Sequence, residues 1–234
     1  MFLSGGYGLY LLFSLPALLL GFWAQSKVRS AYNKYSRVRT YTGLTGSQVA
    51  RKMLDSFGLN HVKIEETRGM LSDHYDPRHE VLRLSQGVYR SNSLSSAGIA
   101  AHEAGHAIQD ARGYMPLKLR SAMVPTVQIG SWIGPIIFMI GFFLASSIGN
   151  SLAWVGIILF SATALFAIVT LPVELDATKR AKAYLSDSGI IYSEEMKGIH
   201  KVLDAAALTY VAGAIQAITT ILYYVFLLGG RRRR

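Results

Sequence analysis

Cysteine is absent from this chain of 234 residues, so the chain has no disulfide framework and no thiolate that could bind a metal or act as a nucleophile. Any zinc ion must therefore be held by nitrogen and oxygen ligands. Acidic residues are also few, 14 against 24 lysines and arginines, which leaves a net charge of +10. No aromatic and basic recognition motif accompanies this charge, so we expect no nucleic-acid partner.

Long stretches of the chain lack charged residues altogether. With 51% hydrophobic residues and a mean hydropathy of +0.29, the composition is too apolar for an ordinary soluble domain. The charge-free runs cover residues 1–26, 121–173 and 205–230, and the middle run is long enough for two spans of about 20 residues with a turn at 146–151. We therefore predict about four transmembrane helices, near residues 4–24, 125–146, 152–171 and 206–228. A cleaved signal peptide is the alternative for the first run, but the run lacks a positive n-region.

The lysines and arginines indicate how these helices are oriented. Those that flank the apolar runs form four groups, at residues 27–39, 112–120, 179–182 and 197–201, all of which would lie on the same side of the membrane. The positive-inside rule places that side in the cytoplasm. The tail Arg231–Arg234 disagrees, because four complete crossings would place it outside. Either the last segment does not fully cross the membrane, or the four larger groups of charges determine the orientation despite the tail. We base the orientation on those four groups.

The first polar segment combines helices and strands. Residues 45–58 read as a short amphipathic helix, with Ser47 as a candidate N-cap and Gly58 as its stop. HVKIEET and EVLRLSQGVY read as strands on either side of a turn at Asp76-Pro77. Ser95 or Ser96 can cap a helix that runs to about Asp110. In the second polar segment, a helix starts near residue 172, a Ser-Asp-Ser-Gly break follows at 186–189, and a helix from residue 193 can continue into the last span.

The helix of residues 95–111 contains the sequence HEAGH, in which His102 and His106 stand four residues apart. Residues at this spacing share one face of an α-helix, about 6 Å apart along its axis, so both imidazoles can bind one tetrahedral zinc ion. Glu103 is rotated by about 100° from His102, which places its carboxylate beside the metal as a general base for a water molecule. Because so short a motif also arises by chance, a metal site needs further ligands to be credible.

A catalytic zinc site needs a third protein ligand and an open fourth position. Nearby candidates fail: Gln109 and Arg112 stand where a longer motif of this type would need glycine and histidine. Asp110 lies about 12 Å along the axis from His102, which leaves it a hydrogen bond to His106 as its candidate role.

Glu174 is the candidate third ligand from a distant part of the chain. It follows Pro172, where the third span ends, and shares an otherwise small or apolar helix face with Thr178. A carboxylate on such a face needs a partner, and a metal ion would satisfy it; the alternative is an acid favoured by the helix dipole in a first turn. Asp176 is rotated by about 200° from Glu174, so we expect it to form an exposed ion pair with Arg180 instead.

Four blocks of the chain resemble the YugP-like neutral zinc metallopeptidases of bacterial membranes: DPRHEVLRLSQGVY, IAAHEAGHAIQDA, LPVELDATKRA and VLDAAALTYVAGA. The apolar hairpin between HEAGH and a downstream E-x-x-A also resembles the HtpX and CaaX prenyl protease group. The resemblance implies a zinc endopeptidase with His102, His106 and a gluzincin-like Glu174 as ligands of one catalytic ion, and Glu103 as the base. Thr178 stands where the broader E-x-x-A-D pattern has aspartate, so the role of that aspartate is not carried over.

These inferences together predict the fold class. We expect a predominantly α integral membrane protein with a zincin-like α+β catalytic region, formed by a small β-hairpin or sheet and the HExxH helix. The predicted segments are an N-terminal transmembrane helix (1–26), a first catalytic segment with the edge strand and the HExxH helix (27–124), a transmembrane hairpin (125–172), a second catalytic segment with the third ligand (173–204), and a C-terminal transmembrane helix with its basic tail (205–234).

Substrate binding is predicted less sharply. In peptidases of this type an edge strand near the zinc pairs with an extended substrate, and the candidate is Val81, Leu82, Arg83, Leu84 and Ser85, unless this is an ordinary internal strand. The donor that stabilises a tetrahedral intermediate is left open between four residues, namely Arg180, Tyr192, His200 and Tyr210.

The function that the sequence favours is that of a zinc endopeptidase in the bacterial cell membrane. Its substrates would be proteins or peptides in or near the lipid bilayer, and its active site would face the cytoplasm. The alternative is a membrane scaffold or binding protein in which the same residues hold a structural or sensory zinc ion. The sequence predicts no oligomeric state.

Overall fold

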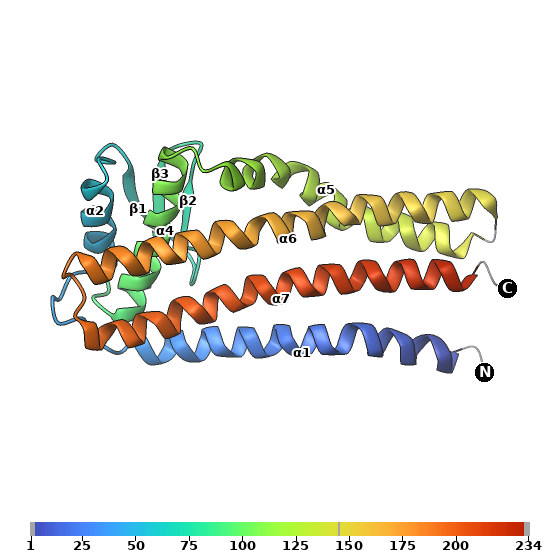
Figure 1. The fold of residues 1–234 in the computed structure, drawn as a ribbon, viewed down its shortest axis with the longest axis horizontal. Helices are drawn as coiled ribbons and strands as arrows, with labels where there is room; N and C mark the ends of the chain where they lie inside the picture. Colours follow the sequence, from blue (N-terminus) through green and yellow to red (C-terminus); the bar gives the residue numbers. More distant parts are fainter. Residues whose placement is uncertain (1–2, 145, 232–234) are drawn as a thin grey trace. The chain divides into compact units, whose positions relative to one another are not determined.

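The structure, a computed structural model, describes residues 3–144 and 146–231, and they are predominantly helical. In chain order the elements are α1 (Leu3–Tyr35), α2 (Gly46–Ser56), β1 (Lys63–Thr67), β2 (His74–Asp76), β3 (Val81–Ser85), α3 (Gln86–Tyr89), α4 (Leu94–Ala111), α5 (Met115–Phe143), α6 (Ser147–Asp187) and α7 (Ser193–Arg231) (Figure 1). The chain divides into two compact units. We call Met1–Trp23, Leu119–Leu171 and Thr209–Arg234 the membrane unit, and Ala24–Lys118 with Pro172–Leu208 the site unit.

Three helices are long and apolar enough to cross a membrane, within the part of the chain that the structure describes: α5, α6 and α7. The span predicted near residues 4–24 falls in α1, which is not among them, so a fourth crossing stays a prediction. Most of the basic tail, residues 232–234, lies outside the described residues. The turn predicted at 146–151 comes earlier, because α6 already begins at Ser147. The Ser146 hydroxyl accepts a hydrogen bond from the Gly149 N–H at 3.1 Å and so caps that helix.

Small residues let α5 and α6 pack closely within the membrane unit. A side chain at Gly141 would place its Cβ 2.3 Å from the backbone nitrogen of Ala153, and one at Gly156 would lie 2.4 Å from that of Phe138. The ring of Phe138 stacks on Tyr224 of α7 at 4.2 Å between centroids. Helices in lipid associate through such close packing, because burial of apolar surface gives them no advantage there.

Helix caps in the site unit use other residues than we predicted. Thr45, rather than Ser47, is the N-cap of α2 and forms a capping box with Gln48. Ser93, rather than Ser95 or Ser96, is the N-cap of α4, and Ser96 completes its capping box. The prediction that Gly58 stops α2 is confirmed by its φ of +75°, a conformation that glycine adopts without strain.

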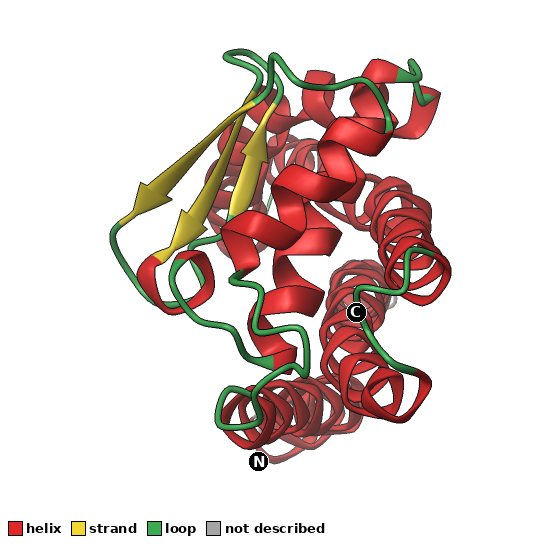
Figure 2. Ribbon diagram, turned by 90° about the vertical axis from the view of Figure 1, so that its left-hand side faces the viewer, coloured by secondary structure: helices red, strands yellow, loops and turns green. Residues whose placement is uncertain are grey.

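The three strands form one sheet in the order β1-β3-β2, with β1 parallel and β2 antiparallel to β3 (Figure 2). Of the two possibilities left open for Val81–Ser85, the structure shows the internal strand, because β3 pairs with β1 along its length and with β2 over residues 81–83. Beyond β2, the carboxylate of Asp73 accepts hydrogen bonds from the N–H and the hydroxyl of Ser85. The last four residues of the predicted strand EVLRLSQGVY form the short helix α3, and β2 ends at the predicted turn.

The second polar segment contains the predicted break but no new helix at residue 172. Helix α6 runs without interruption from Ser147 to Asp187, with Pro172 inside it. Helix α7 begins at Ser193 and continues into the last apolar segment, as expected. Side chains from α2, β3, α4, α6 and α7 share one hydrophobic core in the site unit, and its largest fully buried members are Met53, Leu54, Leu82, Leu84, Ile108, Leu185, Ile199 and Leu203.

Candidate metal centre

Two histidines of α4 and one glutamate of α6 converge inside the site unit. The Nε2 atom of His102 lies 3.1 Å from Oε2 of Glu174, and Nε2 of His106 lies 3.5 Å from the same oxygen. One ligand atom from each of the three residues lies within 4.8 Å of the other two. The spacing of four residues along α4 brings the two imidazole rings to 4.8 Å between centroids, nearly at right angles.

Glu174 reaches the histidines because α4 and α6 approach very closely. Gly105 lies between the two histidines, and a Cβ on it would be 2.9 Å from the carbonyl oxygen of Ala177. Ala177 is fully buried and stands three residues after Glu174. The small residues of HEAGH and E-x-x-A therefore place the two ligand-bearing helices at the distance that the site requires.

This arrangement fits a zinc ion. Zinc is bound by histidine and carboxylate at about 2.0–2.1 Å, and tetrahedral angles then separate neighbouring ligand atoms by about 3.3–3.4 Å. The two separations from Glu174 lie on either side of that value. Glu174 is only 2% exposed, and a carboxylate so deeply buried needs a cation or several hydrogen bonds.

The remaining ring nitrogens of both histidines have hydrogen-bond partners. Nδ1 of His106 donates to the Oε1 of Gln109 at 2.9 Å, and Nδ1 of His102 lies 3.2 Å from the hydroxyl of Thr178, which can act as donor or acceptor. A histidine that donates through Nδ1 presents its Nε2 lone pair to a metal ion. Both Nε2 atoms face Glu174, and the amide oxygen of Gln109 keeps the proton of His106 on Nδ1.

Carboxylates outweigh the effect of burial on His106. Complete burial disfavours its charged form, but the hydrogen bond with Glu174 and the charges of Glu103 and Glu174 raise its pKa above the usual value. Glu103 is half-buried next to the two histidines. Burial also raises the pKa of Asp73, and the negative charge of Glu103 adds to this rise.

Asp110 and Asp176, which we predicted to lie around the metal ligands, have other partners than expected or more of them. Asp110 does not bond to His106, which already has Gln109 as its partner; it accepts a hydrogen bond from the Tyr75 hydroxyl at 3.0 Å. The predicted ion pair of Asp176 with Arg180 is present at 2.6 Å, but Asp176 also accepts a bond from Gln109 at 2.8 Å. The i, i+3 spacing of His106 and Gln109 on one helix face was the signal for this partner in the sequence.

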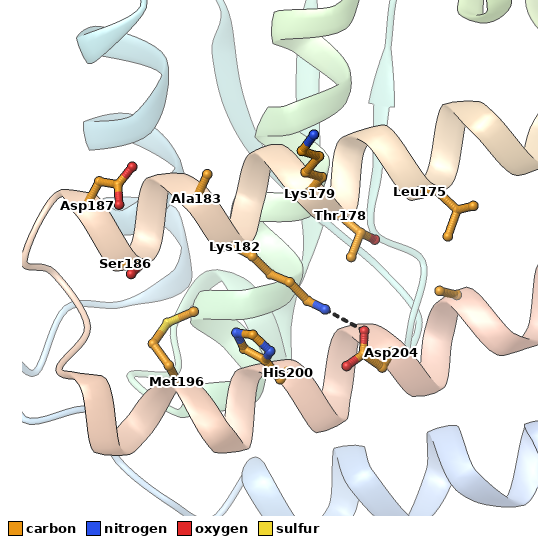
Figure 3. A pocket seen from close by; sticks show the side chains of 11 residues that line it. Leu175, Thr178, Lys179, Lys182, Ala183, Ser186, Asp187, Met196, His200 and Asp204 are labelled. Carbon is orange, nitrogen blue, oxygen red and sulfur yellow. Dashed lines mark hydrogen bonds and ion pairs between the residues drawn. The ribbon is translucent and has the colours of Figure 1, made fainter.

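The candidate oxyanion donors lie in different surroundings, and Arg180 is already paired with Asp176. His200 is exposed and lines a cleft of about 540 Å³ between α6 and α7, in which Lys182 pairs with Asp204 (Figure 3). Thr178, the partner of His102, lies on the wall of the same cleft. Tyr192 is 57% exposed, and Tyr210 belongs to the membrane unit.

A buried His–His–Glu centre with a glutamate beside it, in a chain with helices able to span a membrane, is typical of membrane metallopeptidases. The chain belongs to the family described as "Putative neutral zinc metallopeptidase", which it matches over residues 10–229. It is also 45% identical, over 224 residues, to the "Putative membrane protease YugP" of Bacillus subtilis (strain 168). That alignment covers 95% of this chain and 98% of the relative. No solved structure matches the chain. The cofactor of the centre is accordingly zinc.

Proposed function

We propose that this protein is a zinc-dependent endopeptidase in which His102, His106 and Glu174 hold one catalytic ion. The convergence of these three residues on one point, with Glu103 directly beside them, carries the proposal. The family and the relative described as a membrane protease support it.

Glu103 acts as the general base. When bound, zinc supplies Lewis-acid polarisation of the substrate carbonyl and makes water easier to deprotonate at neutral pH. The carboxylate of Glu103 accepts a proton from the attacking water and later delivers it to the leaving amine. Its position one residue after His102 keeps it beside the ligands without making it one of them.

The substrate strand pairs with β2 rather than with β3. Among the described strands, β2 forms the edge of the sheet on the side of α4, and the bond from Tyr75 to Asp110 fixes it against that helix. An extended peptide can add to such an edge through backbone hydrogen bonds that tolerate varied side chains. Such pairing would let the enzyme accept varied sequences around the cleaved bond.

The substrates are membrane proteins or peptides near the bilayer, and the active site faces the cytoplasm. Three helices able to cross a membrane, α5, α6 and α7, support a multi-pass protein, and α6 carries Glu174 near its apolar part. The grouping of lysines and arginines on one side supports the cytoplasmic orientation.

The test compares wild type with Glu103→Gln, measuring zinc content and cleavage of casein as an unfolded substrate. The variant is expected to keep one zinc ion per chain and to lose cleavage by at least about 100-fold, because only the base is removed. Glu194→Gln, which removes an exposed glutamate in the first turn of α7, is the matched control and should keep both properties. Stoichiometric zinc with no cleavage by any of the three proteins would favour the structural or sensory alternative.

A further inference from the structure

Gln109 is a fully buried residue whose side-chain amide joins the two helices of the metal centre. Its Oε1 accepts the Nδ1–H of His106 at 2.9 Å. Its Nε2 donates two bonds at 2.8 Å, one to the backbone carbonyl of Val173 and one to Oδ2 of Asp176. One side chain of α4 thus contacts α6 on both sides of the ligand Glu174.

These bonds fix the orientation of the amide. An amide nitrogen has two N–H donors and no acceptor, and Val173 and Asp176 offer only acceptors. The nitrogen must therefore point to α6, and the oxygen must point to His106. An oxygen in that place requires a proton on Nδ1 of His106, which leaves Nε2 with its lone pair towards the metal.

Asp176 is itself held from the other side. Its Oδ2 accepts both the Gln109 bond and a bond from Nε of Arg180 at 2.6 Å. A continuous chain of hydrogen bonds, which we call the amide relay, therefore runs through Arg180, Asp176, Gln109 and His106. A metal-bound histidine commonly donates directly to a carboxylate; here an amide stands between the two.

We propose that Gln109 is a positioning residue that sets the proton position of His106 and the placement of Glu174, using the charge of Asp176 through the amide relay. This rests on the proposed function only in taking the centre to be a zinc site. Its consequence is measurable as zinc affinity, whether or not a peptide is cut.

The relay can be tested by exchanging its amide and its carboxylate. Gln109→Glu keeps the acceptor for His106 but removes both donors and sets two carboxylates against each other. Adding Asp176→Asn restores an N–H donor between the two positions. The double variant then has one amide and one carboxylate, as wild type does, but in exchanged places. A residue that merely fills space would not be rescued by this exchange.

The measurement is zinc affinity, by competition with a chelator, in the purified full-length protein. We expect Gln109→Glu, which loses both bonds to α6, to bind zinc about 10- to 100-fold more weakly than wild type, the range typical of mutations around metal ligands, and the double variant to recover most of that loss. Nitrogen-15 chemical shifts of His106 should show its proton on Nδ1 in wild type and in the double variant. Gln86→Glu, at an exposed glutamine of the same unit, is the control for added charge.

Two results would overturn the relay: Gln109→Glu binding zinc as tightly as wild type, or a folded double variant no better than Gln109→Glu alone. If Gln109→Glu does not fold, the zinc affinity of Asp176→Asn alone decides. The proposal requires that Asp176→Asn binds zinc more weakly than wild type, because the amide relay has lost its carboxylate, while the control Gln86→Glu binds it as wild type does. The proposed function fails separately, when wild type binds zinc but cleaves no substrate.

Discussion

Replacing Gly105 with alanine tests whether the close approach of α4 and α6 sets the metal centre. The new Cβ would lie 2.9 Å from the carbonyl oxygen and 3.3 Å from the Cα of Ala177. Ordinary contacts of carbon lie at about 3.5–4.0 Å, so the two helices must move apart by about half an ångström. Backbone atoms cannot give way as the end of a flexible side chain can.

That displacement exceeds what a zinc site tolerates. Ligand distances in metal sites hold to about 0.2 Å, and Glu174 moves with Ala177 on the same helix. We expect zinc affinity to fall at least about tenfold, which corresponds to about 1.4 kcal/mol. Folding should change less, because overpacking costs about 1–3 kcal/mol while alanine gains about 1 kcal/mol over glycine inside a helix.

The assay is chelator competition for zinc together with thermal unfolding of the zinc-free protein in detergent. Gly98→Ala is the matched control, since its Cβ would meet the nearest atom, Cγ2 of Ile199, at an ordinary 3.4 Å. The control should keep its zinc affinity. If Gly105→Ala also keeps it, the distance between α4 and α6 does not set the site and this reasoning is wrong.

Three further predictions follow from single contacts. Thr178→Val, which removes the hydroxyl partner of the His102 Nδ1 atom, should weaken zinc binding about tenfold in a chelator assay, whereas Thr178→Ser should not; equal affinities of the two variants would refute the role of this contact. Tyr75→Phe should raise KM for casein with zinc content unchanged, because β2 loses its bond to α4; an unchanged KM would argue against β2 as the substrate edge. Burial raises the folded-state pKa of Asp73, so its carboxyl group binds a proton more tightly in the folded than in the unfolded protein. The free energy of unfolding of wild type should therefore fall relative to that of Asp73→Asn as pH rises from about 4 through the folded-state pKa. If the two free energies change in parallel with pH across this window, the prediction is contradicted.

The sequence predicted three residues that the structure brings together, because helical spacing is local. Four residues between His102 and His106 dictate a shared face, and an acid on the small face that follows Pro172 required a partner. The structure brings these residues together, and the zinc cofactor is confirmed by the family and by the His–His–Glu group. The same local rules predicted the break between α6 and α7 and the stop at Gly58.

What the sequence missed depends on contacts between distant segments. Alternation identified β3 as a strand, but its neighbours in the sheet come from β1 and β2, and nothing in Val81–Ser85 distinguishes a central strand from an edge. The spacing of Gln109 from His106 was visible in the sequence, but its bonds to α6 were not, because Val173 and Asp176 lie more than 60 residues away. Pro172 suggested a helix start because it lacks an N–H, yet α6 continues through it.

The most direct test of the central claim is the zinc X-ray absorption spectrum of the purified protein, recorded with and without a hydroxamate inhibitor. The account predicts two imidazole nitrogens and one carboxylate oxygen at about 2.0–2.2 Å, with a fourth light atom that the hydroxamate replaces. A spectrum with four protein ligands that the hydroxamate leaves unchanged would identify a closed structural site and would contradict the claim of catalysis.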